Sequence, residues 1–360
     1  KVRLMRLGEL FEKLDNAREA DLSAIKGKII STVQSLDNSK QSASILARVH
    51  NTLRHSSIIQ DIQTNLGGGM SEKFIGEISQ IIFNGLAGFN EESINNFLND
   101  LDDDKVVNTK ALLLPQVQLS SVFSSAAGYK VFKALVKFGI DISRKGPGEF
   151  GLATLSNKIA FPKSGGGDLI IDGSLVEIKS ALSAEARKGG GRLGHQPPVT
   201  VETQRQVFDA FNQKYNNIVE HPRKSISAGK YIDLLNSRLP VGQKTTIGDK
   251  EYKNDSLRYE LSLPLISNII GSSDGKRIAT MISKSNDRET TLNEYYVTQF
   301  NQYKAGSNWD KILFFDLAAD IAISMSNENE FRSAFEYIKI IPPSIVPTQP
   351  NEVFAQLSLR

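Results

Sequence analysis

The sequence predicts an α/β protein in which a mixed β-sheet flanked by helices follows an all-α N-terminal domain. Residues 1–100 carry apolar side chains at three- and four-residue spacing, which is typical of amphipathic helices. Further along, two apolar runs flank Asp172-Gly173, a dipeptide that favours a two-residue β-hairpin turn. The chain has 360 residues, and at about 150 residues per domain this length indicates two domains.

The composition is that of an ordinary globular chain. Hydrophobic residues make up 40% and charged residues 23%, which argues against wholesale disorder. No apolar run approaches the roughly 18 residues of a membrane helix, and charge interrupts the basic opening before a signal-peptide core could form. The chain contains no cysteine, which excludes disulfides, zinc-thiolate sites and cysteine nucleophiles. We therefore expect an intracellular, cytoplasmic protein without membrane association.

The N-terminal domain is expected to span residues 1–125 and to be helical. Leu4, Leu7, Leu10 and Leu14 lie on one helix face, and another helix is expected to begin at Glu91. No residue of this region points to a particular chemistry. An accessory role is the natural interpretation.

Residues 126–345 are expected to form the α/β core. A helix is predicted to begin near Glu149 because Pro147 suits the first helical position. Residues 222–300 mix short patterns with polar loops, so we expect an insertion there. Pro342-Pro343 and Pro347 end the regular pattern and leave an extended tail over 346–360. The other predicted elements are helices over 129–138 and 201–215, the hairpin over 168–179, and strands over 311–315 and 337–341.

The positive charge of the chain is concentrated in its middle third. The net charge of +3 divides into −2 for residues 1–125, +7 for residues 126–230 and −2 for residues 231–360. A basic segment of this kind is suited to contact with phosphate groups. A solvated lysine-rich face is the alternative that charge alone leaves open.

The hairpin turn predicts which side chains meet. With Asp172-Gly173 as the turn, Asp168 faces Glu177 across the two strands. Glu177 and Lys179 are two residues apart on one strand, so they share a face of the sheet. Opposed carboxylates repel each other and require a compensating cation. Two carboxylates and an ammonium group are therefore expected to converge at one end of the hairpin.

This pattern resembles the D…ExK core of the PD-(D/E)XK nuclease superfamily. Asp168 supplies the aspartate, Glu177-Ile178-Lys179 supplies the ExK, and Glu149 matches an upstream acidic position. The resemblance covers roughly residues 145–216, plus the strand at 311–315, and implies a restriction-endonuclease-like core. A second ExK, Glu251-Tyr252-Lys253, lies in a polar stretch without an opposed aspartate and is not expected to form a site.

The resemblance implies roles for these residues. Asp168, Glu177 and the Ile178 carbonyl would hold Mg²⁺, with Mn²⁺ as a substitute, since hard cations prefer oxygen ligands. Lys179 would orient the attacking water or stabilise the phosphorane-like transition state. Glu149 would contact the metal through water or bind a second ion. Structural alternatives are that Glu149 only complements a helix N-terminus, that Asp168 closes a glycine turn, and that Glu177 and Lys179 form an exposed strand pair.

Several polar residues of the basic segment are candidates for DNA contact, with surface solvation as the alternative for each. Arg144 and Lys145 precede the Glu149 helix, and Gln204 and Arg205 begin the helix after the hairpin. The remaining candidates, Arg187, Lys188, Arg192 and His195, occupy a glycine-rich loop whose GxGxxG spacing is followed by prolines rather than by a helix.

Taken together, the sequence predicts a Mg²⁺-dependent DNA endonuclease that hydrolyses phosphodiester bonds and is sequence- or structure-selective. The DNA is expected to be double-stranded or branched, because no aromatic stacking set for single strands is evident. A homodimer is one option that the sequence leaves open. The main alternative is a nuclease-fold DNA-binding or structural module without relevant cleavage. Another phosphoryl hydrolase on a similar hairpin is disfavoured by the missing phosphate-binding loop.

Overall fold

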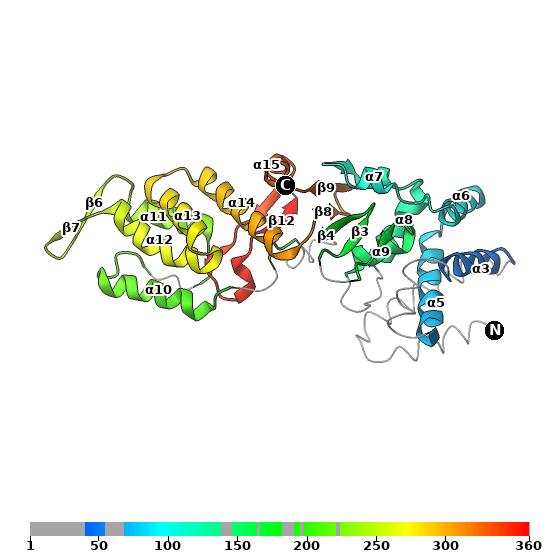
Figure 1. Cartoon of the computed structure of the whole chain (residues 1–360), viewed down its shortest axis with the longest axis horizontal. Coiled ribbons are helices and arrows are strands. Elements are labelled where there is room, and N and C mark those ends of the chain that lie inside the picture. The colour runs from blue at the N-terminus through cyan, green and yellow to red at the C-terminus, as the bar shows by residue number, and fades with distance from the viewer. Residues whose placement is uncertain are drawn as a thin grey trace. The chain divides into compact units, whose positions relative to one another are not determined.

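The computed structural model shows a mixed α/β protein with N-terminal helices, as the sequence predicts (Figure 1). The chain divides into two units, one formed by residues 1–108 and 120–161 and the other by residues 109–119 and 162–360. The structure describes residues 40–54, 68–137, 146–163, 166–181, 191–194, 198–220 and 224–359.

The first unit is built almost entirely from helices. Residues 1–39 lie outside the described residues, but the helix predicted at Glu91 is confirmed. Its N-terminus is capped by Asn90, whose side-chain oxygen accepts a hydrogen bond from the Ser93 N–H at 2.9 Å. The elements of this unit are α3 (Lys40–Arg54), α5 (Gly68–Gly85), α6 (Glu91–Asp102), α8 (Ala126–Lys137), α9 (Pro147–Leu155) and the short strand β2 (Ile159–Ala160).

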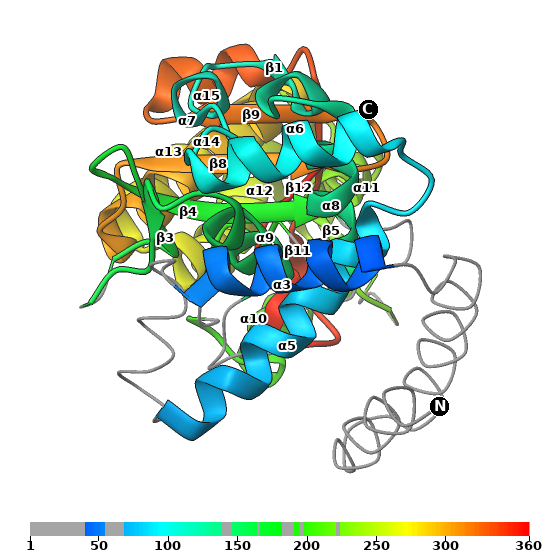
Figure 2. The same cartoon turned by 90° about the vertical axis from the view of Figure 1, so that its right-hand side faces the viewer.

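Five of the six strands of the largest sheet belong to the second unit. In order across the sheet they are β1 (Val117–Gln118), β9 (Ile321–Met325), β8 (Lys311–Asp316), β4 (Ser174–Ala181) and β3 (Leu169–Ile171). β4 runs parallel to β8, whereas the pairs β3–β4, β8–β9 and β1–β9 are antiparallel. Figure 2 shows β4, β8 and β9 side by side in this sheet. The predicted mixed sheet is therefore confirmed.

The predicted hairpin has the predicted register. Ile171 pairs with Ser174 and Leu169 pairs with Val176. Asp172 and Gly173 both have positive φ, 47° and 81°, as a type I′ turn requires. The turn chemistry therefore determines which β4 residues share a face.

The second unit also contains all the described helices that follow the hairpin, together with α7 before it. The predicted helix at 201–215 and the strands at 311–315 and 337–341 are confirmed as α10, β8 and β10. The helices are α7 (Thr109–Leu112), α10 (Val201–Lys214), α11 (Ala228–Arg238), α12 (Asn254–Ile270), α13 (Ser272–Lys284), α14 (Arg288–Ser307) and α15 (Glu328–Ala334). The remaining strands are β5 (Ile226–Ser227), β6 (Lys244–Ile247), β7 (Lys250–Lys253), β10 (Ile338–Ile341), β11 (Ser344–Val346) and β12 (Gln356–Leu359). A short 3-10 turn, η3 (Pro350–Val353), also belongs to this unit, whereas η1 (Leu119–Val122) spans the boundary along the chain and lies mostly in the first unit.

Helices from the region expected to be an insertion pack directly on the sheet. Phe300 and Tyr303 of α14 share one hydrophobic cluster with Ile312 and Phe314 of β8. All four side chains are at most 4% exposed. Residues 222–300 therefore contribute to the same core as the sheet, although their sequence pattern differs from that of the neighbouring segments.

The C-terminal segment is not the extended tail that its prolines suggested. β12 pairs with β10 in antiparallel fashion, and Val353 and Ala355 are fully buried. The prolines end β10 and β11 without preventing the chain from returning to the core. The prediction of an extended tail without regular structure over 346–360 is thus wrong, because local turn signals do not report long-range pairing.

A buried arginine joins the ends of two helices. Arg258 of α12 is fully buried, and its guanidinium donates hydrogen bonds to the carbonyl oxygens of Ile282 and Leu239 and to the Asn236 side chain. Burial lowers the pKa of Arg258 below its ordinary value. Its acceptors lie near the C-termini of α11 and α13, where the helix dipole favours a cation.

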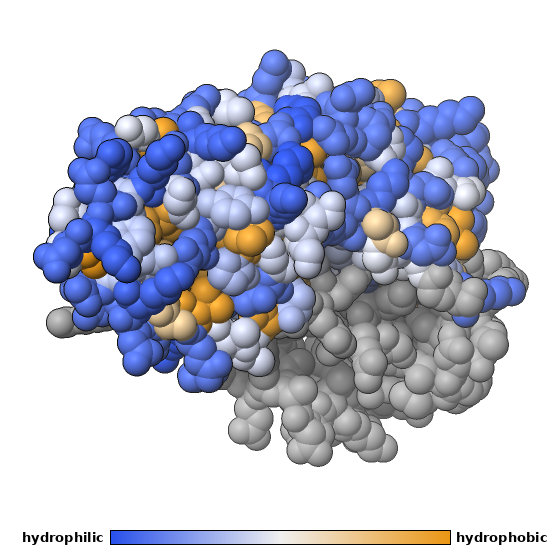
Figure 3. All heavy atoms as spheres, turned by 60° about the vertical axis from the view of Figure 1, so that its left-hand side comes forward, coloured by the Kyte–Doolittle hydropathy of each residue, from blue (hydrophilic) through white to orange (hydrophobic). Residues whose placement is uncertain are grey.

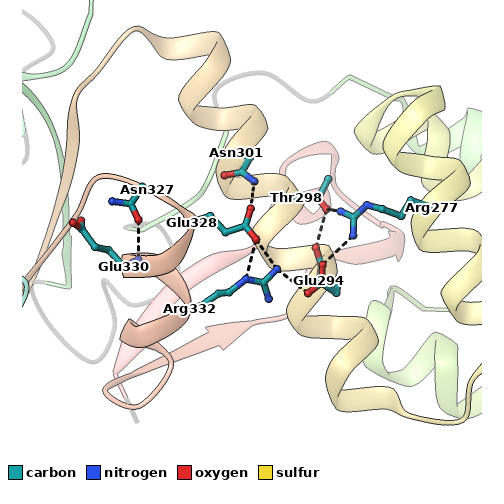
Figure 4. Close-up of polar contacts among 8 residues, drawn as sticks. All are labelled: Arg277, Glu294, Thr298, Asn301, Asn327, Glu328, Glu330 and Arg332. Carbon is teal, nitrogen blue, oxygen red and sulfur yellow. Dashed lines mark hydrogen bonds and ion pairs between the residues drawn. The ribbon is translucent and has the colours of Figure 1, made fainter.

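A network of charged side chains fixes α14 against α13 and α15 (Figure 4). Glu294 of α14 accepts from Arg277 at 2.9 Å and from Arg332 at 2.7 Å. Arg332 also pairs with Glu328, which accepts from Asn301 of α14 at 2.9 Å. Isolated surface pairs contribute little to stability, but shared partners in a network hold a helix more firmly. These contacts hold α14, which presents side chains to the sheet, in place between α13 and α15.

One face of the described residues is largely polar. Figure 3 shows a face on which hydrophilic residues predominate and hydrophobic residues form small separate patches. Among the described residues, the exposed large hydrophobic side chains are Leu114, Tyr337 and Ile341. No helix in the described ranges has the length and apolar character needed to cross a bilayer.

Candidate active site at the hairpin

Glu177, Lys179 and Tyr303 form a closed polar cluster on one face of the sheet. The Lys179 ammonium lies 2.8 Å from Glu177 Oε1 and 2.8 Å from the Tyr303 hydroxyl. The Tyr303 hydroxyl in turn donates a short hydrogen bond to Glu177 Oε1. The ammonium also lies 4.9 Å from the centroid of the Tyr303 ring. Each member of the cluster thus contacts both others.

This cluster is withdrawn from water because β4 is buried on both faces. Val176 and Ile178, which point away from the cluster, are at most 6% exposed. The side chains of Glu177 and Lys179 are only 7% and 15% exposed. The alternative interpretation of an exposed strand pair is therefore excluded. Burial raises the pKa of Tyr303, and the negative charges of Glu177 and Asp168 raise it further, so its hydroxyl keeps its proton.

Asp168 lies directly before β3 and does not continue the ladder opposite Glu177. Its backbone N–H donates to the Val176 carbonyl at 2.8 Å, and its carboxylate accepts from the Ile178 N–H at 2.8 Å. The carboxylates of Asp168 and Glu177 are thus not directly opposed, contrary to what the turn had predicted. The Asp168 carboxylate instead binds a backbone N–H of β4 beyond the end of β3. The negative charge of Asp168 adds to the effects of burial and of Glu177, which raise the pKa of the Tyr303 hydroxyl.

The arrangement supplies oxygen ligands suited to a hard cation. The N–H and C=O of one strand residue point to the same side. Since the Ile178 N–H meets the Asp168 carboxylate, the Ile178 carbonyl faces that same edge. Asp168, Glu177 and this carbonyl match the preference of Mg²⁺ for one or two carboxylates completed by water. Among the described residues no group of three or more acidic or histidine side chains is placed to hold a metal.

A further buried carboxylate lies at the end of β8. Asp316 pairs with Ala181 of β4 and is 1% exposed. One of its oxygens accepts from the N–H groups of Ala318 and Ala319 at 2.8 Å and 3.1 Å. This oxygen therefore closes the turn into β9, which is a structural role.

Glu149 closes the N-terminus of its own helix. Its carboxylate accepts a hydrogen bond from the Gly146 N–H at 2.7 Å, just before α9 begins at Pro147. This contact is the helix-terminus role that was the structural alternative. Glu149 belongs to the first unit, whereas Asp168, Glu177 and Lys179 belong to the second.

The expectation that Gln204 contacts DNA is wrong. Its side chain is fully buried, and the amide donates to the carbonyls of Leu265 and Ile345, each at 2.8 Å, and accepts from Asn268 at 3.0 Å. Gln204 therefore joins α10 to α12 and β11. The helix pattern gave its position but not the direction of its side chain.

The other DNA-contact candidates are described only in part. Arg205 is exposed, and Arg192 is half-buried and forms a β-bridge with Gln356. Glu251 of the second ExK lies in the β6–β7 hairpin and pairs with the exposed Lys244. Outside the described residues lie Arg144, Lys145, Arg187, Lys188 and His195.

Tyr303 is the member of the cluster that the sequence did not indicate. It lies 126 residues after Glu177 on α14. Its ring packs against Trp309 at a centroid distance of 5.8 Å. No motif marks a tyrosine at such a separation, and only the tertiary packing of α14 on β4 and β8 brings it to the hairpin.

Searches of family models, curated proteins and solved structures gave no match to this chain. The geometry of the site and the sequence pattern are thus the basis for a functional proposal.

Proposed function

We propose that this protein is a Mg²⁺-dependent DNA endonuclease with a restriction-endonuclease-like core. The observation that supports this most strongly is the buried pairing of Glu177 with Lys179 beside the carboxylate of Asp168. Burying a carboxylate and an ammonium costs several kcal/mol per ion before pairing. Such an arrangement is typical of functional sites, where charged groups are kept in place for chemistry.

The chain's own residues have distinct roles in this proposal. Asp168, Glu177 and the Ile178 carbonyl would hold the cation, and the Asp168 side chain is oriented by the Ile178 N–H. When bound, Mg²⁺ supplies a Lewis acid for the phosphate and lowers the pKa of water. Lys179 would orient the attacking water and offset the charge that develops on the phosphate. The basic segment around the hairpin would attract the DNA backbone.

The test is cleavage of supercoiled, linear and branched DNA with Mg²⁺ and with a chelator. We compare the wild type with Lys179→Ala and with Lys250→Ala, an exposed lysine of the β6–β7 hairpin that serves as a matched control. Cleavage that needs Mg²⁺, is lost in Lys179→Ala and is retained in Lys250→Ala supports the proposal. Equal metal-dependent rates for the wild type and Lys179→Ala would contradict the assignment of the site.

A second candidate is a DNA-binding or structural module with the nuclease fold and no relevant cleavage. The observation that favours it is the absence of a third acidic or histidine ligand in the described part of the chain. The contacts of Lys179 with Glu177 and Tyr303 would then serve only to stabilise the packing of α14 on β4. DNA binding by gel shift without cleavage of any substrate would support this candidate.

A further inference from the structure

Lys179 has two anchors of different chemistry. One is the Glu177 carboxylate, which lies 2.8 Å from the ammonium. The other is Tyr303, whose hydroxyl accepts from the ammonium at 2.8 Å and whose ring centroid lies 4.9 Å from it. The first anchor is also a ligand in the proposed cation site, whereas the second is neutral and binds no cation in that proposal.

We propose that Tyr303 is a positioning residue that retains Lys179 when a divalent cation takes over the Glu177 carboxylate. A cation on Glu177 competes with the ammonium for the same oxygens and repels it as a like charge. Without a second anchor, the lysine would swing toward solvent, because its four-carbon stem is flexible. The Tyr303 hydroxyl and ring hold it through a hydrogen bond and a cation–π contact. This inference rests on the proposed function for its kinetic consequence.

Tyr303 is suited to this role because the helix that carries it is bonded to several neighbouring elements. Two residues of α14 close to Tyr303 are tied to other elements. Gln299 donates to the Val353 carbonyl at 2.8 Å, and Gln302 donates to Asp274 at 2.8 Å. Further along the same helix, the Glu294 network described above joins α13 and α15 (Figure 4). A side chain on such a fixed element holds a partner more accurately than one on a loop.

The experiment compares the wild type with Tyr303→Phe and Tyr295→Phe. Tyr303→Phe keeps the ring and its packing on Trp309 but removes the hydroxyl. Tyr295 lies on the same helix, is buried and has a hydroxyl without a hydrogen-bond partner, so its substitution is the matched control. Labelling of Lys179 by a limiting amine-reactive ester is measured by peptide mass spectrometry, with and without Mg²⁺. Kinetics of DNA cleavage are measured on the same proteins.

Two results are expected. Mg²⁺ should raise Lys179 labelling several-fold in Tyr303→Phe but not in the wild type or Tyr295→Phe. The kcat of Tyr303→Phe should fall by about tenfold with KM within about twofold, as for a group that acts in the transition state. Thermal unfolding without Mg²⁺ should change little, because Glu177 still holds Lys179.

Other outcomes overturn the proposal. Equal Lys179 labelling in the wild type and Tyr303→Phe with Mg²⁺ would show that the Tyr303 hydroxyl does not hold the Lys179 side chain in place. A loss of kcat accompanied by an equal loss in Tyr295→Phe would indicate a general packing effect. If the wild type cleaves no DNA, the proposed nuclease function fails, while the labelling result still decides the role of Tyr303.

Discussion

Removing either partner of the Glu177–Lys179 pair should cost more stability than removing both. The side chains are 7% and 15% exposed, so each single change leaves a charge in a poorly solvated place. Breaking a fully buried pair costs about 3–5 kcal/mol. Because Lys179 keeps some solvent contact and its bond to Tyr303, we expect about 2–3 kcal/mol for Glu177→Gln. Lys179→Met should cost about the same, since Glu177 retains only the Tyr303 hydroxyl.

The double variant Glu177→Gln/Lys179→Met should lose only about 1 kcal/mol, because no uncompensated charge is left behind. The coupling energy of this cycle is therefore expected to be about 3–5 kcal/mol. Urea unfolding without divalent cations measures it, followed by the fluorescence of Trp309, the single tryptophan of the chain, which is 3% exposed. The fluorescence change must coincide with that of circular dichroism for the two-state treatment to hold.

A matched control for this cycle is the cross-strand pair Lys244–Glu251 in the β6–β7 hairpin. Its ammonium–carboxylate distance of 2.7 Å is nearly the same, but its side chains are 58% and 61% exposed. We expect no measurable coupling there, since water screens exposed charges. Additive single effects at Glu177 and Lys179, with a coupling energy below about 0.5 kcal/mol, would refute the argument that burial makes this pair strong.

Three further predictions concern parts of the second unit. Arg258→Lys should lower the free energy of unfolding by about 2–4 kcal/mol, because an ammonium group cannot reach Ile282 and the acceptors on α11 together, and urea unfolding measures this. Gly173→Ala should cost about 1 kcal/mol in the same assay through its φ of +81° alone, as its surroundings are open; a loss several times larger would point to a clash. Burial alone would raise the pKa of Glu330, but hydrogen bonds from the Ser326 hydroxyl and N–H lower it below its ordinary 4.5. This contribution to stability is complete above pH of about 4.5 and is lost as the pH falls through the lower folded value. Glu330→Gln should therefore flatten acid unfolding curves below that pH, and an unchanged pH dependence would contradict the assignment.

The elements that depend on local signals could be predicted from the sequence. The Asp172-Gly173 turn predicted the β3–β4 register, because a two-residue loop with positive φ at both positions leaves one pairing. The period of two along β4 then predicted that Glu177 and Lys179 share a face. Helix signals were equally informative at Glu91 and Pro147, since first-turn residues act within a few residues.

Contacts between distant segments could not be predicted in this way. The sequence of residues 222–300 indicated an insertion, yet α14 packs on the sheet and supplies Tyr303. Gln204 was placed on the correct helix, but burial against α12 and β11 turned its amide into the core. The prolines near 346 predicted a tail, whereas β12 returns to pair with β10.

The sequence by itself determined the hairpin, its register and the two charged residues that share a face of β4. Only the tertiary structure decided that these charges are buried, that Asp168 bonds to the Ile178 N–H, and that a tyrosine completes the cluster. The physical reason is the separation along the chain over which each kind of interaction acts. Turn and strand geometry follow from neighbouring residues, whereas burial and hydrogen-bond partners depend on helices that pack on the sheet from more than a hundred residues away.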